Sequence, residues 1–159
     1  MSSTRSARAD FDNRANEIVH EWAARRTGQD STESANAWFK RNAYAFLRTY
    51  IEAGKADFFH KIAKHDRRPS RLVEEAMSNP FKLGLLAMFA DESLKRSDRH
   101  VFGNQMLYAY LHDVPSEFLN GFLAVSGGPG VIARKLKEDF VEPGFETKVH
   151  RQLPKVPIP

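Results

Sequence analysis

Apolar residues recur at steps of three and four along nearly the whole chain, and this spacing constrains the fold more than any other feature. Steps of that size place side chains on one face of an α-helix, whereas a half-buried strand alternates at every second residue. The spacing predicts one helix over 8–26 and another over 33–53. Because no stretch sustains strand-like alternation, the sequence predicts no sheet.

Later in the chain, four segments begin with an apolar pair that is repeated one helical turn further on. The pairs start at Phe58, Leu72, Met106 and Phe118. This pattern favours short helices with a broad buried face, which pack into a globule rather than a coiled coil. Asn79 and Pro80 predict the start of a further helix, because Asn caps free backbone N–H groups and Pro is tolerated at the first helical position. A last helix is predicted over 129–141.

Together these segments predict an all-α fold, a compact irregular bundle of about seven or eight short-to-medium helices. We expect residues 1–7 to be a flexible N-terminus, residues 8–142 a single helical domain, and residues 143–159 an extended Pro-rich C-terminal arm. Asp30 and Glu33 have the spacing of a capping box for the second helix. The core candidates are Trp22, Phe39, Leu47, Ile51, Phe59, Ile62, Leu85, Phe89, Leu107, Leu119, Phe122 and Leu136.

Composition excludes several classes of protein. The chain has no cysteine, so disulfides, thiolate nucleophiles and thiolate metal sites are absent. The longest apolar run, Leu83 to Ala90, is far shorter than the roughly 20 residues of a membrane helix. The N-terminal residues contain no apolar segment of a secretory signal. We therefore expect a cytoplasmic protein with no membrane partner.

Positive charge is concentrated in one part of the chain. The formal net charge is +4, from 24 Lys and Arg against 20 Asp and Glu. Residues 40–71 hold nine of these bases and three of the acids, a net +6, which leaves −2 for the remainder. A local surplus of this sign attracts phosphates, anionic lipid or an acidic protein face. The alternative interpretation is an ordinary solvated helix face.

The predicted helix over 33–53 arranges some of these bases in a row. Arg41, Arg48 and Lys55 follow one another at seven-residue steps, so they lie on nearly one face, and Tyr44 falls between the first two. Bases in a row neutralise phosphates, and an exposed ring stacks on a nucleobase. In the alternative interpretation Tyr44 is half-buried on an ordinary exposed face. The predicted nucleic-acid contacts are Arg41, Tyr44, Arg48, Lys55, Lys61, Lys64, Arg67, Arg68 and Arg71.

The three predicted helices over 104–111, 116–124 and 131–141 resemble a helix-turn-helix arrangement, with a Gly-rich turn at 126–130. In that arrangement the last helix enters the major groove of DNA. The turn is longer than the motif prefers, and the first residues of the last helix are apolar. We therefore predict only a secondary contact with phosphates, made by Arg134, Lys135 and Lys137.

Signals for other chemistry are weak. The glycines of residues 126–130 could hold an anion with their N–H groups or form a tight turn, and no Gly-Lys-Ser/Thr follows them. The six histidines show no metal-ligand spacing, and no serine has the setting of a catalytic nucleophile. We predict no metal, cofactor or catalytic residue, and enzymatic activity is left open.

Two hypotheses of different classes follow. The first is a non-enzymatic nucleic-acid-binding accessory or regulatory protein that binds DNA or RNA through its basic helical residues. The second is a helical protein–protein interaction subunit, with a partner or a second copy bound through an aromatic surface and residues 143–159. The first requires the bases of residues 40–71 to converge on one exposed surface.

Overall fold

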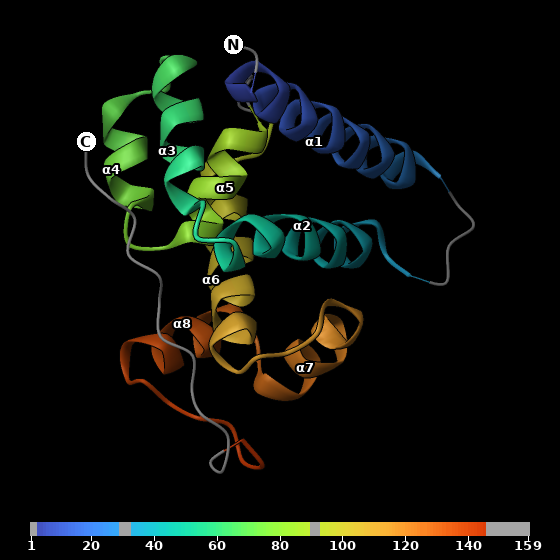
Figure 1. The fold of residues 1–159 in the computed structure, drawn as a ribbon. Coiled ribbons are helices and arrows are strands. Elements are labelled where there is room, and N and C mark those ends of the chain that lie inside the picture. Colours follow the sequence, from blue (N-terminus) through green and yellow to red (C-terminus); the bar gives the residue numbers. More distant parts are fainter. Residues whose placement is uncertain (1–2, 29–32, 90–92, 146–159) are drawn as a thin grey trace.

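The computed structural model describes residues 3–28, 33–89 and 93–145, with side chains from Ser6 onward. Within these ranges the chain is all-α and contains no strand, which confirms the predicted fold class (Figure 1). The elements in chain order are α1 (Ser3–Thr27), α2 (Ala35–Glu52), α3 (Ala56–His65), α4 (Ser70–Ala76), α5 (Pro80–Met88), α6 (Arg96–Leu111), the 3-10 turn η1 (Ser116–Phe118), α7 (Leu119–Ser126) and α8 (Pro129–Lys137).

Local capping explains where several helices begin. Asn79 caps α5 as predicted, because its side chain accepts hydrogen bonds from the N–H groups of the first turn, and Pro80 occupies the first helical position. At α2 the cap is Ser34, whose hydroxyl accepts from the backbone N–H three residues on, so the predicted capping box is replaced by this residue. Asp30 lies outside the described residues. Helix α1 already begins at Ser3, before the predicted start of the helical domain.

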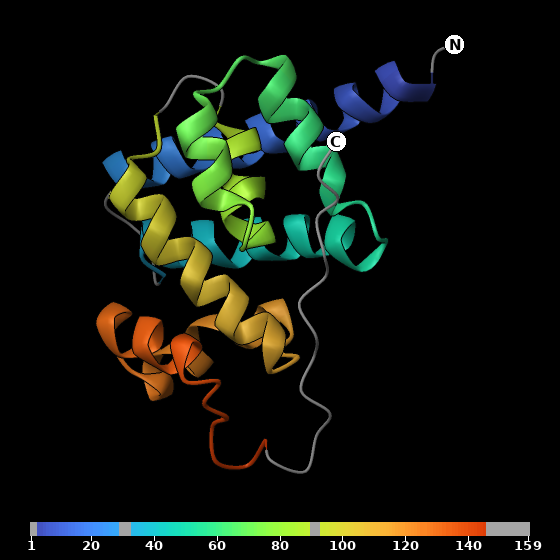
Figure 2. The same cartoon turned by 90° about the vertical axis from the view of Figure 1, so that its left-hand side faces the viewer.

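Helix α5 is the centre of the bundle. It packs against α1, α2, α3, α4 and α6 (Figures 1 and 2). Its side chains are buried on nearly all sides. Gly84 permits the approach of α2, because a Cβ atom there would lie 2.7 Å from the Leu47 side chain. Of the twelve core candidates all are buried except Phe122 and Leu136, which are half-buried. The hydrophobic spacing therefore predicted the core well.

Helix α6 connects the two ends of the molecule. It packs against α5, and α7 and α8 pack against it at the end remote from α3 and α4 (Figure 2). None of the helices in the described ranges is long and apolar enough to span a membrane. Of the predicted C-terminal arm only Pro143 to Phe145 is described, and residues 146–159 lie outside the described part of the chain.

Four helices end in a residue with left-handed backbone geometry. In each case the N–H of this residue and the N–H of the next residue donate to carbonyls of the last helical turn, the pattern of a Schellman cap. Asp139 ends α8 in this way, so the helix stops at Lys137 rather than at 141, and Phe140 is exposed. The left-handed residues are Gly54, Arg67, Asp113 and Asp139.

Candidate nucleic-acid interface

The prediction that Tyr44 is an exposed stacking residue is wrong. Its side chain is fully buried, and its ring packs against Phe81 of α5. The Tyr44 hydroxyl donates to the carbonyl oxygen of Val114 at 2.7 Å. The chain after α6 therefore covers the side of α2 that we expected to face solvent, and Tyr44 is part of the core.

Arg48 also binds the Val114 carbonyl and is not part of an exposed row of bases. Its guanidinium donates to the Val114 carbonyl at 2.6 Å and to the Asp113 carboxylate at 2.6 Å, and its Nε donates to Glu52 at 3.0 Å. The side chain is only 14% exposed. Arg48 thus fastens α2 to the left-handed turn at the end of α6, and its charge is balanced by two carboxylates.

The other bases of α2 are also engaged within the molecule. Arg41 makes a two-pronged ion pair with Glu33, and the hydrogen bond from Arg41 lowers the pKa of the Glu33 carboxyl. Lys40 donates to Gln105 of α6 at 3.2 Å, and burial lowers the pKa of its ammonium group. The structure therefore does not bring a cationic row together on α2.

The Schellman cap of α3 separates two neighbouring arginines. Arg67 has φ of 56° and is exposed, whereas Arg68, the next residue, is only 7% exposed. The Arg68 guanidinium donates to the carbonyl oxygens of Leu86 and Phe89 at 2.6 and 2.5 Å. These groups lie at the C-terminus of α5, where a positive charge is favourable. Arg68 is therefore a buried cap of the central helix, and its prediction as a phosphate contact is wrong.

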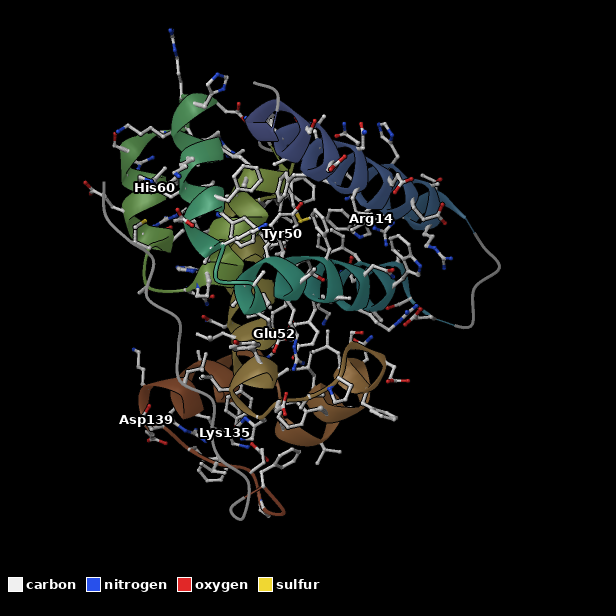
Figure 3. All side chains as sticks on the ribbon, viewed as in Figure 1. Arg14, Tyr50, Glu52, His60, Lys135 and Asp139 are labelled. Atoms are coloured by element: carbon white, nitrogen blue, oxygen red, sulfur yellow. The ribbon has the colours of Figure 1, made fainter. Side chains whose placement is uncertain are left out.

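The predicted bases of α8 lie far from those of α3 and α4. Figure 3 shows His60 on α3 and Lys135 on α8 at opposite ends of the molecule. Lys135 is engaged with Glu142 at 2.7 Å and with the Ser126 carbonyl at 2.8 Å. Arg134 is exposed near Glu138, and Lys137 is exposed with no ion-pair partner in the described ranges. The two predicted groups of contacts therefore do not form one surface.

Bases do gather at the groove between α3 and α4. This groove has a volume of about 860 Å³ and is lined by the bases Lys64, Arg67 and Arg68, with Glu74 as the one acid among its described lining residues. Lys64, Arg67 and the adjacent Arg71 are exposed and have no ion-pair partner within the described residues. We call these three residues the α3–α4 cations.

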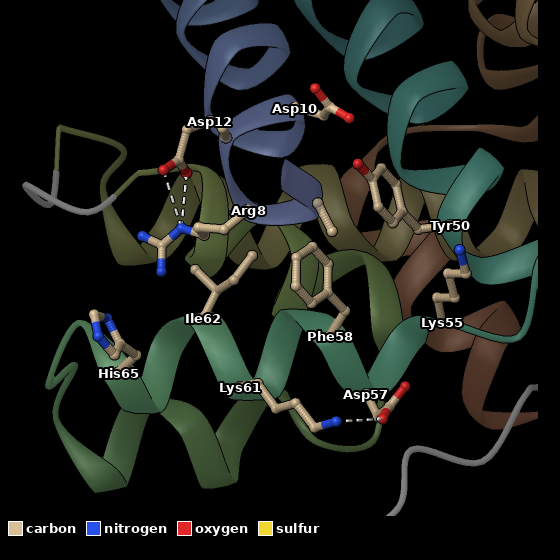
Figure 4. Close-up of a pocket in the computed structure, with 12 residues that line it drawn as sticks. Arg8, Asp10, Asp12, Tyr50, Lys55, Asp57, Phe58, Lys61, Ile62 and His65 are labelled. Atoms are coloured by element: carbon tan, nitrogen blue, oxygen red, sulfur yellow. Dashed lines mark hydrogen bonds and ion pairs between the residues drawn. The ribbon is translucent and has the colours of Figure 1, made fainter. Parts of the chain in front are cut away.

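A second groove, between α1, α2 and α3, has a different character. Its volume is about 1000 Å³, and Phe58 and Ile62 rise from α3 to form its apolar floor (Figure 4). Charges of both signs line it and mostly pair with one another: Arg8 contacts Asp12, and Lys61 contacts Asp57 at 3.4 Å. Among the described residues, Lys55 and Asp10 of this groove have no ion-pair partner. Because the charges cancel, this groove attracts phosphate less than the α3–α4 groove does.

The remaining candidates have structural explanations. The turn at 126–130 is tight, since Gly127 has φ of 121° and a Cβ atom there would lie 2.9 Å from Val131. His112 is buried and hydrogen-bonded on both ring nitrogens to backbone groups. The described residues hold no group of three His, Asp or Glu side chains suited to a metal ion. Comparison with family models, curated proteins and solved structures finds no match.

Proposed function

We propose that the protein binds the phosphate backbone of nucleic acid, DNA or RNA, through the α3–α4 cations and without catalysis. The observation that carries the proposal is that Lys64 and Arg67 line one groove, that Arg71 follows in the first turn of α4, and that all three are exposed and have no ion-pair partner among the described residues. Residues 55–71 hold six bases and two acids, a net +4 that equals the formal charge of the whole chain. On α8, by comparison, Lys135 is engaged with Glu142 and Arg134 lies near Glu138, which leaves Lys137 as the one exposed base there without an ion-pair partner among the described residues.

The backbone at Arg67 supports the proposal. A non-glycine residue in the left-handed region costs about 1 kcal/mol. Glycine usually occupies this position of a Schellman cap. An arginine here gives up stability and gains an exposed charge beside the groove, as expected if the charge has a use. The contacts are to phosphates and carry no sequence preference by themselves.

Salt dependence tests the proposal directly. Three phosphate contacts on duplex DNA predict a slope of about −2.7 for the logarithm of the binding constant against the logarithm of the salt concentration. Replacing two of the cations, Lys64→Gln with Arg67→Gln, should reduce the slope to about −0.9. Fluorescence anisotropy, with a labelled duplex and with a single strand of equal length, measures the slopes of the wild type and of the double variant.

A matched variant changes two charges at the other end of the molecule. Arg134→Gln with Lys137→Gln removes the same charge from α8, and we expect it to leave the slope unchanged. An equal loss in both double variants would mean that only net charge matters. That result, or the absence of salt-sensitive binding to either probe, contradicts the proposal.

A second candidate function, protein–protein interaction, has its own supporting observation. The large apolar side chains exposed in the described ranges all belong to the last third of the chain: Phe118, Val125 and Phe140. Exposed aromatic and aliphatic side chains that cluster mark interaction surfaces. Association in sizing experiments that is lost when Val125 is replaced by Glu, with nucleic-acid binding unchanged, would favour this candidate.

A further inference from the structure

The groove between α3 and α4 has an apolar lining as well as its bases. Val73 is 8% exposed and Met77 is half-buried, and the two are four residues apart, so they lie on one face of α4 and its C-cap. The same groove is lined by His60 and Lys64, which are four residues apart on α3. An apolar row of one helix and a polar row of the other therefore share the groove.

The apolar row does not suit a phosphate group. Phosphate needs hydrogen-bond donors and positive charge, and the side chains of Val73 and Met77 offer neither. The flat face of a nucleobase suits them better, because a thioether sulfur makes favourable contacts with aromatic rings. The groove volume of about 860 Å³ lies within the range of small-molecule pockets. The groove therefore offers room and a suitable surface for one nucleobase.

His60 supplies an aromatic ring at this place. Its side chain is half-buried and makes no hydrogen bond or ion pair within the described residues, whereas His112 is held by two hydrogen bonds. Aromatic side chains, histidine included, stack on bases that are splayed out of single-stranded nucleic acid. The bases of a duplex are stacked on one another and do not enter a groove. The ring of His60 therefore favours a single strand.

Glu74 gives the groove a preference among bases. It is the one acid among the described lining residues, is exposed, and its carboxylate has no partner within them. The charge of Glu74 repels phosphate and so opposes the binding that the neighbouring cations favour. A carboxylate accepts a hydrogen bond from the amino group of cytosine. Thymine and uracil have no amino group, and their carbonyl oxygens face a carboxylate unfavourably.

We infer that the α3–α4 groove takes one unstacked base of a single-stranded nucleic acid and prefers cytosine to thymine or uracil. His60 stacks on the base, Val73 and Met77 contact it from α4, and Glu74 accepts a hydrogen bond from its amino group. The α3–α4 cations bind the adjoining phosphates. The inference rests on the proposed phosphate binding and adds to it the class of nucleic acid and of base.

Binding to labelled strands of about 12 nucleotides, all cytosine or all thymine, and to a duplex of equal length tests the inference by anisotropy. We expect the cytosine strand to bind about tenfold more tightly than the thymine strand, as for one specific base contact. His60→Ala should weaken the binding of both strands about tenfold and leave duplex binding unchanged. The matched control is His65→Ala, an exposed histidine of α3 outside this groove, which should change none of these affinities.

A second pair of variants tests the base preference. Glu74→Ala should reduce the ratio of the cytosine and thymine affinities to about one. Glu75→Ala removes the same charge from the next residue, which is bound to Arg96 and does not line the groove, so the ratio should stay at about ten. The same comparison with RNA strands of cytosine and uracil measures which sugar is preferred. Circular dichroism verifies that each variant is folded.

The outcomes separate this inference from the proposed function. Strands that lose no affinity in His60→Ala, or a wild type without a preference for cytosine, would overturn the inference, while salt-sensitive duplex binding would still support the proposed function. The absence of salt-sensitive binding to every probe would overturn both.

Discussion

The backbone N–H of Glu142 donates to Nε2 of His112 at 3.0 Å and thereby ties the chain after α8 to the end of α6. Because Nε2 accepts this bond, the ring proton is on Nδ1, which donates to the Tyr108 carbonyl at 2.8 Å. The Glu142 carboxylate accepts hydrogen bonds from Lys135 and from the Tyr108 hydroxyl. His112 is thus part of a buried structural contact.

Replacing the carboxylate by its amide, Glu142→Gln, should lower the free energy of unfolding by about 2 kcal/mol at neutral pH, because Lys135 loses its buried counter-charge. Burial opposes the charge of Glu142, but the hydrogen bonds from Lys135 and Tyr108 outweigh it, so the pKa lies below the ordinary 4.5. The charged form therefore adds stability that is complete above pH 4.5 and is lost as the pH falls through the lower folded-state pKa.

Urea unfolding followed by tryptophan fluorescence, at a series of pH values, measures the difference between this variant and the wild type. The difference should shrink in acid. The control is Glu21→Gln, which removes an exposed ion pair with Arg25 on α1 and should change stability by no more than about 0.5 kcal/mol. A difference for Glu142→Gln that does not depend on pH would contradict the assignment.

Tyr44 and Arg48 share an acceptor, so their loss should not be additive. Tyr44→Phe alone should cost about 1 kcal/mol, because Arg48 still donates to the Val114 carbonyl. Arg48→Met alone should cost about 2 kcal/mol, since it also removes the bonds to Asp113 and Glu52. The double variant leaves the Val114 carbonyl without either donor. Its loss of unfolding free energy should exceed the sum of the two single losses by about 1 kcal/mol in a double-mutant cycle. Strict additivity would show that the shared carbonyl is unimportant.

The sequence predicted those features that local chemistry determines. The cap of α5 at Asn79, the end of α2 at Gly54 and the buried spacing of the core follow from capping, backbone freedom and helical periodicity. Tyr44 was misplaced because the residue that covers it, Val114, is 70 positions away in the sequence. Periodicity reports which side of a helix is apolar, but it cannot show which distant segment covers a polar side.

The candidate site was predicted only in part, for a related reason. Arg67, Asp113 and Asp139 take left-handed geometry without the glycine that would signal it, so the turns after α3, α6 and α8 carry no sequence mark. At the first of these turns the geometry sends Arg68 inward and Arg67 outward. Two adjacent arginines that look equivalent in sequence therefore have different roles.

Arg68→Met should lower the free energy of unfolding by about 3 kcal/mol, because the carbonyls of Leu86 and Phe89 lose a buried charged donor at the end of α5. Arg71→Met is the matched control, since this arginine is exposed and lacks an ion-pair partner within the described residues. We expect its stability to stay within about 0.5 kcal/mol of wild type. Equal effects of the two substitutions in urea unfolding would refute the capping role of Arg68.

Arg67→Gly should separate stability from binding. Glycine adopts φ of 56° without strain, so the free energy of unfolding should rise by about 1 kcal/mol. The lost charge should reduce the magnitude of the salt slope for duplex DNA by about 0.9. Arg67→Ala removes the same charge but keeps the Cβ atom, so it should share the binding loss without the gain in stability. A glycine variant whose salt slope equals that of the wild type would remove Arg67 from the proposed interface.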